Sequence, residues 1–243
     1  MPASIGDEKH RGHGTRRSPR SYVGRMSMLT LYSYWRSSAA YRVRIALNLK
    51  GLPYKQVPVH LVKDGGQQHS ADYQALNPQE LLPLLVDEDN GGVRIAQSLA
   101  ILEYLDEVFP TPALLPSDPA KRAQVRALAL HIACDLHPLN NLRVLQYLTG
   151  ELGVSEAKKD AWYQHWLHKG MAAVEAGLAV FDDRLSLGER PGYLEACLVP
   201  QLYNARRFNC DLDAYPRILA MAARCESLDA FKQAAPEVQP DAQ

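Results

Sequence analysis

In the first third of the chain, residues 28–35 alternate between hydrophobic and polar positions, and residues 54–61 form a second strand-like segment. Both are rich in β-branched and aromatic residues, and such alternation predicts half-buried strands. Between them, apolar residues recur at near-helical spacing, which predicts a helix over residues 38–49. Gly51 follows as the C′ residue of that helix, and Pro53 as a stop signal. The order strand, helix, strand predicts a parallel β-α-β unit.

A second pair of strands is predicted within residues 81–98, where the strongest signal is the dipeptide Asn90-Gly91. Asn-Gly between apolar runs is typical of a β-hairpin. Pro83 cannot donate a hydrogen bond inside a central strand, so it marks a strand start, an edge or a special peptide bond. Leucines recurring on one side predict a helix over residues 98–109, directly after the hairpin.

A proline-rich stretch at residues 110–117 predicts a linker. Beyond it the pattern is helical almost throughout and contains no strand-like run. The sequence therefore predicts a small α/β domain over residues 28–109, followed by an all-helical domain over residues 118–243.

Composition and charge bear on the classes of partner. The chain has 47% hydrophobic and 22% charged residues and a formal net charge of zero, which is typical of a globular protein. No strong field favours nucleic acid or an anionic membrane, and no apolar run approaches the roughly 20 residues that span a bilayer. We expect neither a nucleic-acid nor a membrane partner.

The cysteines are widely spaced and form no C-x-x-C pair, which indicates no metal site. They are Cys134, Cys197, Cys210 and Cys225. Such spacing is typical of buried thiols in a reducing compartment, so we expect packed thiols and a cytoplasmic location.

The N-terminal residues 1–27 differ from the rest. They hold six basic and two acidic side chains, a net charge of +4, so the rest of the chain carries −4. They lack the apolar core of a secretory signal, and their composition predicts a disordered basic tail. A nucleic-acid-binding arm and a later start site at Met26 or Met28 are the alternatives.

Two adjacent hydroxyls, Ser37 and Ser38, stand where the first strand gives way to the helix, next to Arg36. A serine in this place caps a helix by accepting a hydrogen bond from a free backbone N–H. A helix start also carries the positive end of the helix dipole, which suits an anion or a thiolate. The pattern alone leaves both interpretations open.

Several phrases in a fixed order carry a resemblance to a known family: SSAAYRVRIALNLKG, KDGGQQ, ALNPQ, QSLAILEYLDE and LVPQLYNARRF. Together they resemble the zeta class of the glutathione transferases, from residue 28 to about residue 239. The resemblance implies a thioredoxin-like α/β domain followed by an all-helical domain, glutathione as cofactor, and a homodimer. It also implies a glutathione-dependent cis-trans isomerase acting on maleylacetoacetate or, as the alternative, on maleylpyruvate.

The resemblance further implies how glutathione is held. Gln97 and Ser98 correspond to the pair that binds the γ-glutamyl carboxylate at a helix start. Pro83 is similar to a cis-proline that turns the backbone of Leu82 toward the tripeptide. The further contacts that it implies come from Gln68 and, in the second domain, His137. A plain helix cap for the serine and a core or capping role for the histidine are the alternatives.

The catalytic step needs a thiolate, because a free thiol has a pKa near 8.5 and only its anion attacks. Ser37 is predicted to donate a hydrogen bond to this thiolate, with Ser38 in support. The carboxylates of the substrate suit arginine, whose planar fork matches them and stays charged. The substrate-binding candidates are Arg36, Arg143 and Arg207, with surface helix charge as the alternative for each.

Two places depart from the family pattern. Ala39 stands where the zeta-class phrase has a cysteine, which puts in doubt any side activity that needs that thiol. Gly192 and Glu195 stand where many relatives have a capping box of threonine and aspartate, which predicts a weaker folding signal with the fold retained. A general glutathione transferase or dehalogenase, and a non-catalytic binding module, are the other function classes left open.

Overall fold

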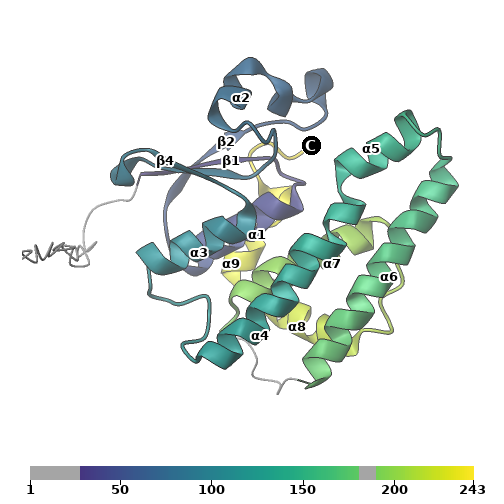
Figure 1. The fold of residues 1–243 in the computed structure, drawn as a ribbon. Coiled ribbons are helices and arrows are strands. Elements are labelled where there is room, and N and C mark those ends of the chain that lie inside the picture. Colours follow the sequence, from purple (N-terminus) through teal and green to yellow (C-terminus); the bar gives the residue numbers. More distant parts are fainter. Residues whose placement is uncertain (1–27, 181–189) are drawn as a thin grey trace, which may run out of the picture.

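The computed structural model describes residues 28–180 and 190–243. Its first part is built on a mixed sheet with the strand order β2-β1-β3-β4 (Figure 1). The strands are β1 (Leu29–Ser33), β2 (Tyr54–Pro58), β3 (Leu84–Asp87) and β4 (Val93–Ala96). β1 and β2 are parallel, whereas β3 runs antiparallel to both β1 and β4. The predicted β-α-β unit and hairpin are confirmed.

The helices of this part lie on both faces of the sheet, α1 (Ser38–Leu49) and α3 (Ser98–Val108) on one and α2 (Ala71–Leu76) on the other (Figure 1). Gly51 has a φ of 63°, the left-handed conformation of a C′ glycine, and the Leu52 N–H donates to the Leu47 carbonyl at 3.0 Å. Glycine adopts this conformation without the steric cost of a Cβ. The predicted end of the first helix is confirmed.

The hairpin loop is longer than a two-residue turn. A 3₁₀ turn over Glu88–Asn90 precedes Gly91, which has a φ of 74°. The cause is Asp87, whose carboxylate accepts hydrogen bonds from the backbone of Asp89 at 3.1 Å and of Asn90 at 3.3 Å. These bonds favour an extra turn of chain over a tight reversal.

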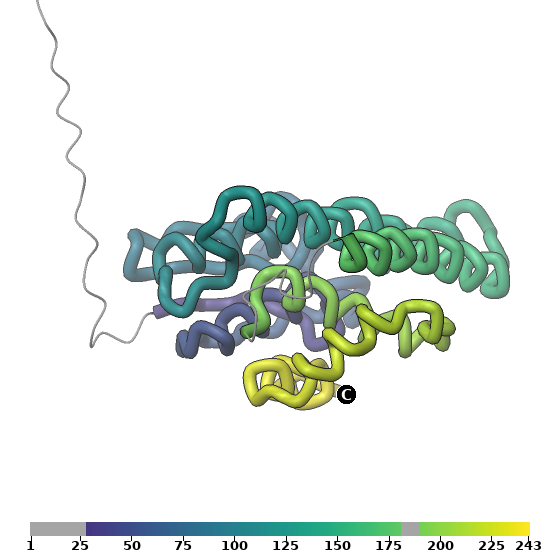
Figure 2. The backbone as a smooth tube through the Cα atoms, turned by 90° about the horizontal axis from the view of Figure 1, so that it is seen from below, coloured from purple at the N-terminus to yellow at the C-terminus, as the bar shows by residue number. Residues whose placement is uncertain are grey.

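The rest of the described chain is helical, as predicted. Its helices are α4 (Pro119–Leu130), α5 (Leu142–Gly150), α6 (Glu156–Val180), α7 (Tyr193–Arg207), α8 (Pro216–Glu226) and α9 (Asp229–Lys232). Figure 2 shows α7 between the layer of α4 and α6 and the yellow C-terminal segment. The Gly192 N–H donates to Glu195 at 2.9 Å at the start of α7, so the glycine N-cap with its N3 glutamate is confirmed.

One hydrophobic core joins the two parts, because α1 packs on the buried helix α7. Lys50 and Asp106 form a buried ion pair at 2.8 Å near the joint. Lys50 also donates to the carbonyls of Phe109 at 2.7 Å and Pro112 at 2.8 Å, which fixes the start of the proline-rich stretch. The predicted fold class is confirmed, and the domain boundaries stay predictions.

The prediction of buried cysteines is wrong for Cys134, which is exposed. It lies in a π-helical turn over His131–Leu136. The wider turn shifts the side-chain register, so this position leaves the apolar face that α4 presents to the core. Cys197 and Cys210 are buried, and burial raises the pKa of each thiol to about 11. Cys225 is buried too, and its pKa is likewise raised by burial.

The tail predicted at residues 1–27 lies outside the described residues. Across 28–180 and 190–243, the helices are too short or too polar to cross a membrane. The same residues contain no group of histidine, cysteine or acidic side chains that could hold a metal ion.

Candidate active site

Ser37 is the N-cap of α1. Its backbone is extended, with φ −69° and ψ 113°, and its Oγ accepts a hydrogen bond from the Ala40 N–H at 3.2 Å. The capping interpretation is therefore confirmed. Capping uses a lone pair of the oxygen and leaves the hydroxyl proton to be donated elsewhere, so it is compatible with a bound anion.

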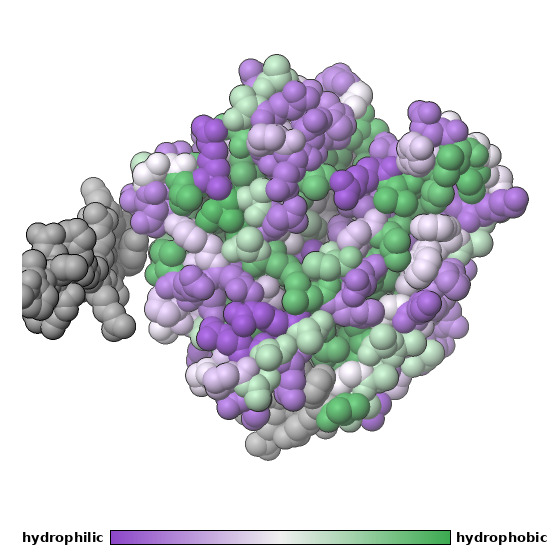
Figure 3. Space-filling view, viewed as in Figure 1, coloured by the Kyte–Doolittle hydropathy of each residue, from purple (hydrophilic) through white to green (hydrophobic). Residues whose placement is uncertain are grey.

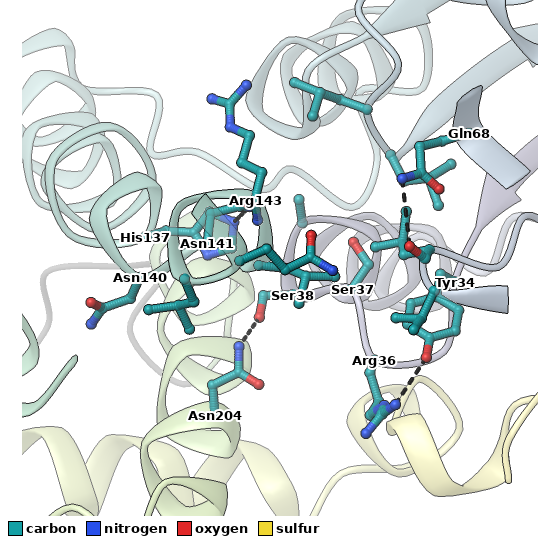
Figure 4. Close-up of a pocket in the computed structure, with 18 of the residues that line it drawn as sticks. Tyr34, Arg36, Ser37, Ser38, Gln68, His137, Asn140, Asn141, Arg143 and Asn204 are labelled. Carbon is teal, nitrogen blue, oxygen red and sulfur yellow. Dashed lines mark hydrogen bonds between the residues drawn. The ribbon is translucent and has the colours of Figure 1, made fainter. Parts of the chain in front are cut away.

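Ser38 is buried and faces Asn204 of α7 (Figure 4). Asn204 Nδ2 donates to Ser38 Oγ at 2.5 Å. Ser38 thus accepts one hydrogen bond, as Ser37 does, and within the described residues no acceptor lies against either hydroxyl proton. Two hydroxyl donors are available at the positive end of α1.

Both serines line a cavity of about 490 Å³ between the α/β part and the helical part. Figure 3 shows a hollow on this face, between the part that carries α2 and the part that carries α5. Most of the candidate residues line the cavity: Arg36, Ser37, Ser38, Gln68, Leu82, His137, Arg143 and Arg207. The other two, Gln97 and Ser98, line a second cavity of about 140 Å³. Leu82, His137 and Arg143 line both, so the fold brings every candidate residue to one continuous site.

The second cavity ends at the start of α3. Ser98 is buried there, and its Oγ accepts a hydrogen bond from Arg42 Nη1 at 3.2 Å. The preceding residue, Gln97, has a φ of 70°, a conformation that non-glycine residues adopt rarely and mainly at functional sites. Arg42 is 2% exposed, and in the described chain its Nε and Nη2 have no partner. A buried guanidinium with unused donors creates a strongly anion-binding environment at this helix start.

Leu82 precedes a cis peptide bond to Pro83, as predicted. Gln68 is buried and lies across the larger cavity from α1 (Figure 4). Its Nε2 donates to the Leu61 carbonyl at 3.5 Å and lies 2.9 Å from His69 Nε2. Its place depends on Gly66, which has a φ of 103°. A Cβ at position 66 would lie 2.6 Å from Gln68 Nε2. Glycine at position 66 thus provides the backbone conformation and the space that the Gln68 amide occupies.

His137 joins the site from the helical part. Its Nε2 accepts from Asn141 Nδ2 at 3.3 Å, which places the proton of the neutral ring on Nδ1. Burial, and to a smaller extent the charges of Arg42 and Arg143, lower the pKa of His137 to about 3. The imidazole is therefore neutral at physiological pH and acts as a hydrogen-bonding group.

The candidate arginines reach the larger cavity from separate segments. Arg36 precedes α1, Arg143 lies in α5, and Arg207 ends α7. Arg36 lies over the Trp35 ring at 4.7 Å and donates to the Tyr34 hydroxyl at 3.1 Å. In the described parts of the chain none of the three pairs with a carboxylate. Their guanidinium groups are thus available to an anionic ligand.

The N-terminal domain family of the glutathione S-transferases matches residues 27–107. A probable maleylacetoacetate isomerase of Vibrio cholerae is 54% identical over 217 residues, covering 89% of this chain and all of that protein. A holo structure of a bacterial maleyl pyruvate isomerase, a zeta-class glutathione S-transferase, superposes with a TM-score of 0.82 at 47% identity, covering 88% of this chain and all of that one. The chain belongs to the zeta class of the glutathione transferases. A maleylacetoacetate isomerase of Methylobacterium extorquens, solved with malonate and glutathione bound, has a TM-score of 0.82 at 37% identity over 88% of this chain and 99% of its own.

This zeta-class site contains no protein thiol. Ala39 lines both cavities, in the place where the family phrase has a cysteine. All the cysteines lie in the described part of the chain, and none of them lines either cavity. A nucleophilic sulfur in this zeta-class site must therefore come from a ligand.

The sequence did not indicate the residues that contact the candidates from other segments. Asn204 was not predicted, although it precedes Arg207 by three positions and so lies on the same side of α7. Asn141, two positions before Arg143, holds His137. Arg42 was not among the predicted site residues, since its part in the site depends on the packing of α1 against α3.

Proposed function

We propose that this protein is a glutathione-dependent cis-trans isomerase that converts maleylacetoacetate to fumarylacetoacetate. The observation that carries the proposal is the larger cavity, where two hydroxyls at the start of α1 and arginines from three separate segments converge. Hydroxyl donors at a helix start favour a thiolate, and convergent arginines favour a substrate with carboxylates. The family membership and the similarity to named isomerases support the same reaction.

The residues present fit glutathione as the cofactor. Arg42 Nη2, Gln68 Oε1 and Asn204 Oδ1 are buried atoms without a partner in the described chain, and each belongs to a side chain that lines one of the cavities. A tripeptide with two carboxylates and several N–H groups offers partners to such donors and acceptors. We assign the γ-glutamyl carboxylate to Ser98 at the start of α3, where the dipole and Arg42 favour an anion.

We assign the other glutathione contacts to residues by their places on the cavity wall. Leu82 offers its backbone before the cis peptide bond, in the manner of an added strand. Gln68 offers its amide from the opposite wall, and His137 a neutral imidazole. The thiol then lies toward the start of α1, within reach of Ser37 and Ser38.

When bound, glutathione supplies the thiolate that adds reversibly to the cis double bond of the substrate and leaves again after rotation about the resulting single bond. Ser37, supported by Ser38, donates a hydrogen bond to the sulfur and so lowers the free energy of its anion. The arginines Arg36, Arg143 and Arg207 bind the carboxylates and stabilise negative charge that develops on the diketone. Rotation needs room, and the cavity of about 490 Å³ provides it.

Maleylpyruvate is the alternative substrate, favoured by the equally high TM-score of the maleyl pyruvate isomerase structure. The test is an isomerisation assay with both substrates in parallel, with and without catalytic glutathione, while free thiol is titrated. We expect turnover that requires glutathione without consuming it, and a higher kcat/KM for maleylacetoacetate. A higher kcat/KM for maleylpyruvate would reverse the substrate assignment. Glutathione consumed in proportion to product would identify a conjugating transferase instead.

We also propose a homodimer in the cytoplasm. The support for the dimer is the family together with exposed apolar side chains on the helical part, among them Leu130 of α4, which is 43% exposed. The support for the cytoplasm is that all four cysteines are free. Light scattering on the purified protein tests the dimer, and cell fractionation tests the location.

A further inference from the structure

The loop Tyr34–Ser37 carries two residues of the proposed chemistry, Arg36 and Ser37. The Ser37 N–H donates to the Tyr34 carbonyl at 2.9 Å, so the position of the serine depends on the peptide plane between Tyr34 and Trp35. Arg36 depends on the same residues, because its guanidinium lies over the Trp35 ring. It also donates to the Tyr34 hydroxyl (Figure 4). Whatever fixes the peptide groups on either side of Trp35 therefore fixes both functional groups.

Arg44 fixes those groups from beneath. It lies on α1, is fully buried in the core and lines neither cavity. Its Nη2 donates to the Trp35 carbonyl at 3.0 Å, and its Nη1 to the Ser33 hydroxyl at 3.1 Å and the Tyr34 carbonyl at 3.4 Å. A buried guanidinium holds carbonyl groups strongly, because its bonds are charge-assisted and its fork is rigid.

The same guanidinium also holds the C-terminal segment. Arg44 Nε donates to the Ala234 carbonyl at 2.9 Å, across 190 positions of sequence. Burial lowers the pKa of Arg44 to about 10, with Asp241 among the charges that oppose the fall, so the group stays charged at neutral pH. The cation thus ties the loop before α1 to the last residues of the chain.

Asp241 completes the link from the other side. Its Oδ2 accepts from the Trp35 N–H at 3.0 Å, and its Oδ1 lies 3.5 Å from Gln56 Nε2 of β2. Ala242 packs against the small apolar cluster that contains Tyr34 and Trp35. Both polar backbone groups of Trp35 are therefore held: its N–H donates to the Asp241 side chain, and its carbonyl accepts from the Arg44 guanidinium.

We propose that Asp241 and Arg44 are positioning residues of the active site, and that the C-terminal segment, residues 229–242, holds the loop that presents Ser37 and Arg36. This inference rests on the proposed role of Ser37 as donor to the glutathione thiolate. Neither residue touches the ligands, and both act through the backbone of Tyr34 and Trp35. The C-terminal segment is thereby a determinant of thiolate stability and of substrate alignment.

The test compares Asp241→Ala, Asp241→Asn and the control Asp229→Ala in the full-length protein. Asp229 is on the same segment, and its side chain is 87% exposed and lies 3.9 Å from Lys232 Nζ. The main readout is the pKa of the glutathione thiol in the complex, followed by thiolate absorbance in the ultraviolet, which requires binding and no isomerase activity. Thermal unfolding and the kcat and KM of isomerisation are measured beside it.

We expect Asp241→Ala to raise the thiol pKa in the complex and to lower kcat about tenfold, since small displacements of reacting groups have effects of this size. Asp241→Asn keeps an acceptor for the Trp35 N–H, so its thiol pKa and kcat should stay close to those of the wild type. The control should resemble the wild type. A variant Asp241→Ala with a lower Tm and an unchanged thiol pKa and kcat would overturn the inference and leave the segment a purely structural role.

The two proposals fail differently. A wild-type protein that binds glutathione with a lowered thiol pKa and isomerises neither substrate would refute the isomerase and leave the positioning role measurable through the thiol. A wild-type protein that binds glutathione without lowering the pKa of its thiol would refute the positioning role, because Ser37 would then stabilise no thiolate for the loop to position.

Discussion

Asn204 Nδ2 donates to Ser38 Oγ at 2.5 Å, which joins the centre of the helical part to the first turn of α1. The two residues are 166 positions apart in sequence. The bond occupies a lone pair of the serine oxygen, so the hydroxyl proton is directed elsewhere, and the cavity is the space it faces. The helical part thereby orients a donor that the α/β part supplies.

Asn204→Ala should lower kcat by about threefold to tenfold, because it removes the group that orients Ser38. A double-mutant cycle with Ser38→Ala measures the coupling: the asparagine change should have almost no effect once the serine hydroxyl is absent. Additive effects on kcat would contradict an action of Asn204 through Ser38.

Arg206 and Arg207 are neighbours at the end of α7 and form a matched pair. Arg207 lines the larger cavity, whereas Arg206 pairs with Glu226 at 2.5 Å on the surface. Arg207→Ala should lower kcat/KM by about 10- to 100-fold, the value of a charge-assisted hydrogen bond, while Arg206→Ala should stay near the wild type. Steady-state kinetics with the two variants decides, and equal losses would remove Arg207 from the substrate site.

Arg42 is buried without a carboxylate partner, so the ligand-free protein bears the cost of a desolvated charge. Burial also lowers the pKa of its guanidinium. Arg42→Met should increase the free energy of unfolding without ligand by about 1 kcal/mol and weaken glutathione binding about tenfold. Urea unfolding and calorimetric titration measure the two effects, with the more exposed Arg126→Met as control. Weaker folding together with unchanged glutathione affinity would show that Arg42 is only structural.

His137 gives a pH dependence with a definite sign. Its pKa is about 3 in the folded protein against an ordinary value of 6.5, so above pH 6.5 the ring is neutral in both folded and unfolded chains. As the pH falls below 6.5 the unfolded chain binds a proton and the native one does not, so the free energy of unfolding declines toward pH 3. Between pH 7.5 and 4.5, the free energy of unfolding measured with urea should decline less for His137→Asn than for the wild type. His165→Asn, on the exposed side of α6, serves as the control. Parallel declines for the wild type and His137→Asn would contradict a lowered pKa of His137 in the folded protein.

The local elements could be predicted because their signals are local. Gly51 at the end of α1, Asn90 and Gly91 in the hairpin, and Ser37 as a cap are each determined by a few neighbouring residues. The candidate site came from the family resemblance, and its residues do line one pair of cavities. Their individual roles stay predictions.

The residues that hold the candidates in place could not be predicted. The bond that Arg42 donates to Ser98 joins residues 56 positions apart, and the bond that the Trp35 N–H donates to Asp241 joins residues 206 positions apart. No periodicity or spacing in the sequence indicates such contacts. The exposed Cys134 was mispredicted for a related reason, since a π-helical turn changes the face on which a side chain emerges.

The capping role of Ser37 can be separated from its proposed role as hydrogen-bond donor to the thiolate. Ser37→Ala removes the cap and the donor together and should cost about 1 kcal/mol of stability, whereas Ser37→Gly removes the donor and retains most of the capping preference. The most direct measurement is therefore the isomerisation rate of Ser37→Gly with limiting glutathione, beside the wild type. We predict a wild-type rate proportional to glutathione that is not consumed, and a rate for Ser37→Gly at least about tenfold lower with stability within a few tenths of a kcal/mol. A Ser37→Gly protein that isomerises at the wild-type rate would show that the Ser37 hydroxyl does not activate the thiol.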